Sequence, residues 1–260
     1  MAGESQFRLL SERRFGPLFW TQFLGAANDN LFKFSFTLLA TYHAAQWGGV
    51  DPATAGFVIG AIFIAPFLIF SATAGQLADK IEKGRLMRFV KSFEIAVMAI
   101  AGAGFATQNA MLLYAAVFLM GLHSTVFGPV KYAYLPQHLR ADELTGGNGL
   151  VEMGTFVAIL AGTMAGGLLV KASAMGATYV AVACVVVAVA GRVAAHFIPA
   201  SPAPDPALAI NWNPFSETWR NLAIAARNRA VFNSLLGISW LWFFGSIFLT
   251  SFTPFARLVL

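Results

Sequence analysis

Charged residues are scarce in this sequence, and their scarcity limits the class of protein it encodes. Asp, Glu, Lys and Arg make up 11% of the 260 residues, whereas a soluble domain usually carries about 25%. Hydrophobic residues reach 58%, and the mean hydropathy is +0.68. Too few charges remain to cover a surface that faces water. We therefore predict an integral membrane protein.

Cysteine is almost missing as well. Cys184 is the only one and lies within the apolar run VAVACVVVAVA, so an intramolecular disulfide and a metal site of the cysteine-cluster type are both excluded. The sequence also lacks a Gly-x-Ser-x-Gly nucleophile motif and a phosphate-binding P-loop. We expect no catalysis, no metal and no cofactor within these residues.

Basic residues lie mainly at the ends of the apolar runs, although the net charge is +5. That placement is typical of membrane topology rather than of a nucleic-acid-binding stripe, so we expect no nucleic-acid partner. Twelve bases fall on one set of connections: Arg8, Arg13, Arg14, Lys80, Lys83, Arg85, Arg88, Lys91, Arg140, Arg220, Arg227 and Arg229. The opposite connections, at 47–53, 105–110 and 171–176, contain Lys171 alone. The positive-inside rule therefore predicts a cytoplasmic N-terminus.

Seven segments have the length that a membrane helix needs, which is about 20 apolar residues. They are 16–46, 54–78, 86–107, 110–136, 148–171, 176–199 and 232–257. The first is far longer than the core of a signal peptide, which is about 7–15 residues, so we interpret it as a retained helix. The predicted fold is an all-α integral membrane protein.

A stretch rich in proline, IPASPAPDPALAINWNPF, divides the chain and indicates a linker. We predict a cytoplasmic N-terminal segment at 1–14, a six-helix bundle at 15–199, a cytoplasmic linker at 200–231 and a seventh transmembrane helix at 232–260. The linker contains ETWRNLAIAARNRAVF, which is typical of an amphipathic helix at the membrane interface. Six helices plus one is an unusual complete protein, so we expect the seventh to begin a second bundle of a longer chain.

Polar residues interrupt the first predicted span. A charge at bilayer depth costs about 2.5–3.5 kcal/mol on insertion scales and usually faces a cavity or a partner. The stretch QFLGAANDNLFKFSF nevertheless contains Asn28, Asp29, Asn30 and Lys33. Asp29 and Lys33 are four residues apart, so they share a helix face and could form an ion pair. An internal pair without substrate contact is the alternative to a binding role.

Later spans carry Glu94, Lys131 and Glu152. Glu94 begins a helix near the cytoplasmic side, and we favour a role in which it extends its carboxylate to the membrane interface or pairs with Lys91. His123 is a single histidine in apolar surroundings, for which we favour a structural hydrogen bond over proton coupling.

Glycines recur downstream of Glu152. Gly162, Gly166 and Gly167 form a face of small residues, which is typical of close helix packing in membranes.

The most specific motif is GQLADKIEKGRLMRF, at the end of the second predicted span. It is similar to the signature of the major facilitator superfamily, written roughly Gly-x-Leu-Ala-Asp-Arg/Lys-x-Gly-Arg/Lys. The matching positions are Gly75, Leu77, Ala78, Asp79, Lys80, Gly84 and Arg85, with extra residues before Gly84. Gly75 would let two helices approach closely, and Asp79 would pair with a base at a gate. A charged turn that only sets topology is the alternative.

Three further stretches narrow the resemblance. QFLGAANDNLFKF, GPVKYAYLPQHL and NGLVEMGTFVAILAGTMAGGLL resemble the bacterial lysophospholipid transporter family, and the similarity runs from about Phe15 to Leu260. The resemblance implies a facilitator-type six-helix bundle in the inner membrane that flips lysophospholipids by alternating access for reacylation. LGISWLWFFGSIFLTSF is similar to versions fused to acyltransferase and acyl-carrier-protein synthetase domains. It implies such enzymes as partners, besides the membrane lipids.

The same resemblance implies a substrate cavity between the first and fourth spans. Asn28, Asp29, Asn30 and Lys33 would then lie opposite Lys131. A lysophospholipid offers a phosphate, which Lys131 would bind, and often an ammonium group, which Asp29 or Glu152 would bind. The acyl chain would contact aromatic side chains, unless these only pack helices: Phe32, Phe34, Phe36 and Phe127.

Two other functions stay open. One keeps the fold but exports another amphipathic molecule or drug. The other is a membrane anchor for an acylating enzyme, although an anchor has no need for Asp29, Lys33, Lys131 and Glu152 in lipid.

Overall fold

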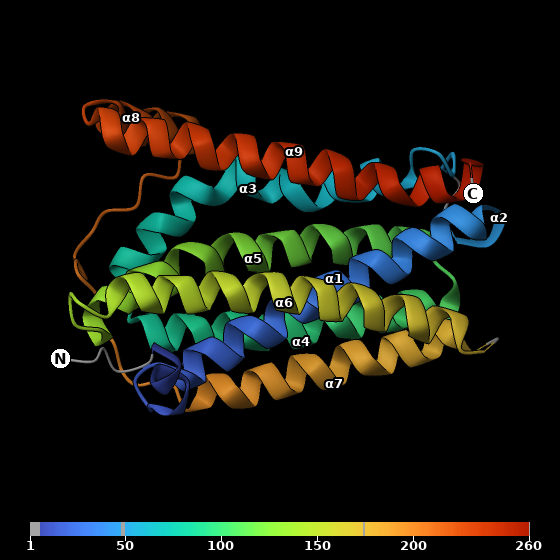
Figure 1. The fold of residues 1–260 in the computed structure, drawn as a ribbon, viewed down its shortest axis with the longest axis horizontal. Coiled ribbons are helices and arrows are strands. Elements are labelled where there is room, and N and C mark those ends of the chain that lie inside the picture. The colour runs from blue at the N-terminus through green and yellow to red at the C-terminus, as the bar shows by residue number, and fades with distance from the viewer. Residues whose placement is uncertain (1–5, 48–49, 174, 260) are drawn as a thin grey trace.

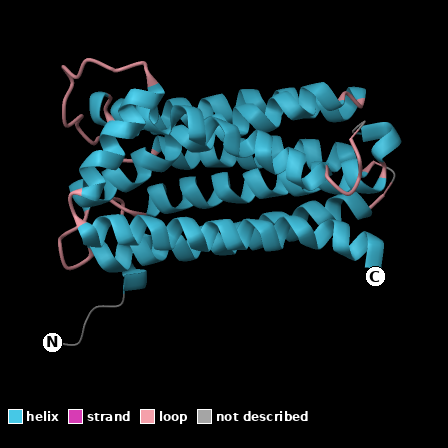
Figure 2. Cartoon of the chain, turned by 90° about the horizontal axis from the view of Figure 1, so that it is seen from above, coloured by secondary structure: helices cyan, strands magenta, loops and turns pink. Residues whose placement is uncertain are grey.

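The computed structural model describes residues 6–47, 50–173 and 175–259, and within these ranges every regular element is a helix (Figures 1 and 2). The predicted segments 1–14 and 232–260 and the predicted connections 47–53 and 171–176 extend partly outside the described residues. The elements are η1 (Gln6–Ser11), α1 (Gly16–Tyr42), α2 (Ala44–Trp47), α3 (Ala55–Lys80), α4 (Lys83–Thr107), α5 (Ala110–His138), α6 (Leu144–Lys171), α7 (Gly176–His196), α8 (Pro214–Ala226) and α9 (Arg229–Val259).

Six of these helices are long and apolar enough to cross a membrane: α3, α4, α5, α6, α7 and α9, the last over Arg229–Phe252. α1 is long enough, with 27 residues, but it is not among the six. Its amides and charges lower its hydropathy, although the structure forms a long helix at the first of the seven predicted segments. More than half of α1 is buried by neighbouring helices, which is how a polar segment is accommodated inside a membrane bundle.

The long helices lie side by side, and α1 crosses the others obliquely (Figure 1). α1 packs mainly against α6 and α7, α3 packs against α5, and α4 packs against α5 and α7. The predicted face of small residues, which lies on α6, allows the contact between α1 and α6. A Cβ on Gly162 would lie 2.2 Å from the carbonyl oxygen of Ala27, and one on Gly166 would lie 2.7 Å from Ser35 Oγ. The two backbones therefore approach as closely as small residues allow.

Residues 197–213 leave the bundle and run along one end of it to α8 (Figure 1). This end also holds η1, the turn between α3 and α4 and the turn between α5 and α6, and we call it the N-terminal end. α8 is amphipathic, as expected, and exposes Phe215, Trp219 and Leu222. α9 packs against α3 and α8 at the edge of the molecule, and none of the described residues in its apolar membrane-span window is buried.

Candidate functional site

α1 carries Asn28 and Asp29 into the interior of the bundle, where both are buried. Successive residues of a helix point about 100° apart, so these two reach different helices. Asn28 Nδ2 donates a hydrogen bond to Glu94 Oε1 on α4 at 2.8 Å. Ser124 Oγ on α5 donates to Asp29 Oδ2 at 2.7 Å.

Glu94 is the centre of a buried ionic cluster. Its carboxylate pairs with Lys91 one helical turn earlier, and His123 Nε2 lies 3.1 Å from its Oε2 atom. Lys91 and Glu94 have no exposed surface, and His123 is 3% exposed. The predicted Lys91–Glu94 pair is therefore confirmed, but deep in the bundle. Burying two opposite charges is tolerable only when they are paired and hydrogen-bonded.

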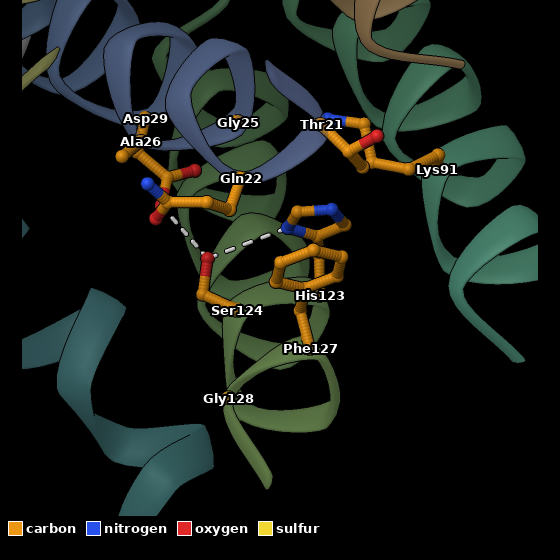
Figure 3. A pocket seen from close by; sticks show the side chains of 10 residues that line it. All are labelled: Thr21, Gln22, Gly25, Ala26, Asp29, Lys91, His123, Ser124, Phe127 and Gly128. Atoms are coloured by element: carbon orange, nitrogen blue, oxygen red, sulfur yellow. Dashed lines mark hydrogen bonds between the residues drawn. The ribbon is translucent and has the colours of Figure 1, made fainter. Parts of the chain in front are cut away.

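His123 joins the two groups of contacts. Its Nδ1 atom lies 3.3 Å from Ser124 Oγ, and its ring stacks parallel to Phe127. We call the resulting set the buried network: Asn28, Asp29, Lys91, Glu94, His123 and Ser124. It spans α1, α4 and α5 (Figure 3). The hydrogen bonds of this network link the three helices that contribute its members.

A small cavity lies against this network (Figure 3). Its volume is about 80 Å³, and its walls are Thr21, Gln22, Gly25, Ala26, Asp29, Lys91, His123, Ser124, Phe127 and Gly128. That volume suits on the order of two or three water molecules, not a lipid headgroup, because ligand sites are usually about 300–1,000 Å³. One oxygen of Asp29, Oδ1, is buried without a hydrogen-bond partner.

Lys33 does not form the predicted ion pair with Asp29. Among the described residues, no Asp29–Lys33 contact lies within ion-pair distance, and Lys33 Nζ instead sits 3.6 Å above the ring of Phe63. A cation over an aromatic face is attracted by the ring quadrupole. Asn30 Nδ2 donates to the backbone oxygen of Ala26 on its own helix at 2.8 Å.

Lys131 and Glu152 form a second polar group. Tyr132 donates its phenolic hydrogen to Glu152 Oε1, and Lys131 Nζ lies 4.8 Å from the Tyr132 ring. Lys131 follows Ser124 by seven residues, which is about 10 Å along a helix. In the described part of the chain, no hydrogen bond links this pair to the buried network. Asp29 therefore faces Ser124 and His123 rather than Lys131 as predicted.

The aromatic residues expected to receive an acyl chain mostly fill the core. Phe32 and Phe36 have no exposed surface. Phe32 contacts Phe105 edge-on, and Phe36 contacts Tyr114 in the same way. Helix packing, the alternative named for these residues, is thus their role in this structure, while Phe127 alone of the four lines the small cavity.

The signature motif lies in the turn from α3 to α4 and holds the linker. Lys80 Nζ donates to the carbonyl oxygen of Leu208 at 2.8 Å, and the carbonyl oxygen of Asp79 accepts from the amide of Asp205 at 3.1 Å. The predicted ion pair of the Asp79 carboxylate is not found within the described ranges. A Cβ on Gly75 would meet nothing within 4 Å, so the close approach expected there is not found either.

Glu82, inside the motif, makes the contacts that sequence reasoning missed. Its carboxylate accepts hydrogen bonds from the amides of Gly84 at 2.7 Å, Arg85 at 2.6 Å and Ser201 at 2.8 Å. Partial burial opposes ionisation of this carboxyl, but these three donors outweigh it and hold its pKa below the ordinary value. Glu82 thereby caps α4 and ties the linker to it. A Cβ on Gly84 would lie 2.9 Å from Glu82 Oε1, which accounts for glycine there.

Comparison with known proteins adds the family. The model of the Major Facilitator Superfamily matches residues 18–260. The lysophospholipid transporter LplT of Enterobacter sp. (strain 638) is 30% identical over 223 residues, which cover 85% of this chain and 52% of that protein. LplT of Serratia proteamaculans (strain 568) and of Escherichia fergusonii are each 31% identical, with the same coverage. The chain thus spans about half the length of the curated relatives it matches. No solved structure matches it.

Proposed function

This chain belongs to the Major Facilitator Superfamily and is a multi-pass membrane protein, and from that premise we propose that it forms the N-terminal half of a lysophospholipid transporter. The observation that carries the proposal is the charge inside α1. Asp29 is buried, and one of its oxygens has no partner. A buried carboxylate oxygen without a partner costs free energy, so a ligand that pairs with it is favoured. The similarity to proteins named lysophospholipid transporters supplies the cargo.

Transport by this mechanism requires a second bundle. Alternating access rocks two bundles around a site at the membrane midplane, and the chain supplies one bundle plus α9. We propose that the complete protein resides in the bacterial inner membrane with the N-terminal end of the bundle on the cytoplasmic side. Lysophospholipid delivered there would be reacylated by an acyltransferase and an acyl-carrier-protein synthetase. The residues described here would bind and move the lipid without changing it chemically.

We propose two contacts with the lipid headgroup. Lys131 is half-buried and would bind the phosphate, since an ammonium group donates strong charge-assisted hydrogen bonds to phosphate oxygens. Asp29 would bind the headgroup ammonium, and Glu152, which accepts a hydrogen bond from Tyr132, is the alternative acceptor. The cavity next to Asp29 is too small for a headgroup, so we propose that it widens when the two bundles rock apart.

Uptake of labelled lysophosphatidylethanolamine by spheroplasts that express the full-length protein tests the proposal. We expect Asp29→Ala and Lys131→Ala each to reduce uptake at least about tenfold, since each removes a contact worth about 1.4 kcal/mol or more. Lys171→Ala is the matched control, because Lys171 is exposed at the far end of α6 and should leave uptake unchanged.

The outcomes separate the alternatives. If the wild type takes up the lipid and both variants take it up equally well, the proposed contacts of Asp29 and Lys131 with the headgroup are contradicted. If the full-length protein takes up no lysophospholipid, an exporter of another amphipath or an anchor for an acylating enzyme explains the chain better.

A further inference from the structure

The hydrogen bonds of the buried network restrict where its protons can lie. We first take Asp29 as ionised. An ionised carboxylate only accepts hydrogen bonds, and a serine hydroxyl has a single proton to give. Ser124 Oγ donates that hydrogen to Asp29 Oδ2, at 2.7 Å. The contact between Ser124 Oγ and His123 Nδ1, at 3.3 Å, is therefore one in which Nδ1 carries the hydrogen and the serine oxygen accepts it.

The other side of the imidazole then faces a carboxylate. His123 Nε2 lies 3.1 Å from Glu94 Oε2 and makes no hydrogen bond in the described structure. If Nδ1 holds the only ring hydrogen, a nitrogen lone pair points toward an anionic oxygen, and the two repel each other. With Asp29 ionised, the network is consistent only when Nε2 is protonated as well, which makes His123 an imidazolium ion.

A second arrangement contains the same number of protons. Asp29 is protonated and donates from Oδ2 to Ser124 Oγ, Ser124 donates to His123 Nδ1, and His123 Nε2–H faces ionised Glu94. The two arrangements interconvert by moving one proton from Asp29 to Ser124 while the serine proton moves to Nδ1. The O–H bond of Asp29 breaks, the O–H bond of Ser124 is exchanged and an N–H bond forms at His123, so His123 gains one positive charge as Asp29 gains one negative charge.

We propose that Asp29, Ser124 and His123 form a proton-transfer chain, in which His123 accepts the proton of Asp29 when a cationic headgroup binds to Asp29. This proposal rests on the proposed function, and it adds a proton site to it. Without a ligand, protonated Asp29 avoids an unpaired buried charge. When an ammonium group arrives, ionised Asp29 pairs with it, and the displaced proton stays in the protein on His123.

Charged groups from the neighbouring helices lie around His123. α4 contributes Glu94 as the counter-ion of the imidazolium, and Lys91 keeps Glu94 ionised by pairing with its Oε2 atom. α1 contributes Asp29, with Lys33 one turn further along. On α7, the thiol of Cys184 lies within electrostatic reach of Glu94. α3 meets α5 at Gly121, where the nearest α3 atoms are the backbone carbonyl of Phe63 and the ring of Pro66.

The number of protons released on binding tests the chain directly. Full-length protein in detergent is titrated with lysophosphatidylethanolamine in a weakly buffered solution that contains a pH-sensitive dye. We expect the wild type to bind without releasing a proton, so that its Kd stays constant from about pH 6 to about pH 8. In His123→Gln the proton of Asp29 has no acceptor, so about one proton is released per lipid bound. Its Kd should fall about tenfold per pH unit.

Two controls isolate the effect. His196→Gln changes an exposed histidine on α7 and should behave as the wild type does. Lysophosphatidylglycerol has no ammonium group and should bind with a pH-independent Kd to every variant. A merely structural role of His123 would weaken binding of both lipids without changing the proton count.

Clear results would overturn the inference. Release of a full proton by the wild type, or an unchanged proton count in His123→Gln, rules out His123 as the acceptor while leaving the transporter proposal intact. Failure of the wild type to bind either lipid contradicts the proposed function, and the proton chain with it. If His123→Gln does not fold, Ser124→Ala interrupts the same chain and is expected to release the same proton.

Discussion

Glu143 joins the first turn of α6 to the residues that precede α1. Its carboxylate accepts two hydrogen bonds from the Arg14 guanidinium, at 2.6 and 2.7 Å, and one from the amide of Arg140, at 2.9 Å. These donors stabilise the ionised form and lower the pKa of Glu143 to about 2. A two-pronged contact of this kind fixes both position and angle, so Glu143 ties the segment that precedes α1 to the start of α6.

The pH dependence of stability follows from that pKa. The folded state ionises Glu143 more readily than the unfolded chain, whose pKa is near the ordinary 4.5, so the contribution is present above about pH 4.5. It is lost as the pH falls toward about 2, because the unfolded state then binds more protons. We expect amide exchange in the first turn of α6 to accelerate over that window. The Glu143→Gln variant should lack this acceleration, and matching acid profiles in the two proteins would contradict the assignment.

Helices are the scale at which the sequence was most informative. Hydropathy of about 20 residues in a row is a property of the chain itself, so the predicted spans 110–136 and 148–171 match α5 and α6 within a few residues. The predicted run 16–46 is instead interrupted at His43, between α1 and α2. Apolar composition continues past that point, and only the backbone conformation reveals the break.

The site was less predictable, because it depends on how the helices are rotated. Lys91 and Glu94 are three residues apart on one helix, so their pairing follows from local geometry. His123 comes from another helix and reaches Glu94 only in one relative rotation of α4 and α5. No sequence spacing encodes that rotation. The same reasoning explains why Asp29 was expected opposite Lys131 and lies opposite Ser124.

The contact between α1 and α6 gives a prediction with a control on the same helix. A Cβ on Gly162 would lie 2.2 Å from the carbonyl oxygen of Ala27, whereas one on Gly149 would meet nothing within 4 Å. Gly162→Ala must push α1 away, and we expect it to lower the free energy of unfolding by about 1–3 kcal/mol. Gly149→Ala should raise it by about 0.5–1 kcal/mol, because alanine favours a helix. Unfolding in denaturant measures both, and equal effects would refute the close packing.

At the scale of the whole molecule, the linker and the first bundle form one continuous structure at the N-terminal end. Gln76 both donates to and accepts from Asn211, Lys80 holds Leu208 and Glu82 holds Ser201. The signature motif therefore determines the path by which the chain leaves the bundle toward α9. These contacts anchor the linker at the N-terminal end of the bundle.

Substitution of Glu82 tests how strongly its carboxylate holds the linker at Ser201. Glu82→Ala removes the acceptor for the amides of Ser201, Gly84 and Arg85, and each lost hydrogen bond of a charged acceptor is worth about 1.5–3 kcal/mol. We expect amide exchange at Ser201 and at the start of α4 to accelerate at least about tenfold. Exchange within α6 should not change. Asp142→Ala is the matched control, since Asp142 is 73% exposed and pairs with the exposed Arg140. If amide exchange at Ser201 stays slow in Glu82→Ala, the contacts of Gln76 and Lys80 hold the linker without Glu82. Several residues of the motif, rather than one carboxylate, would then fix the linker.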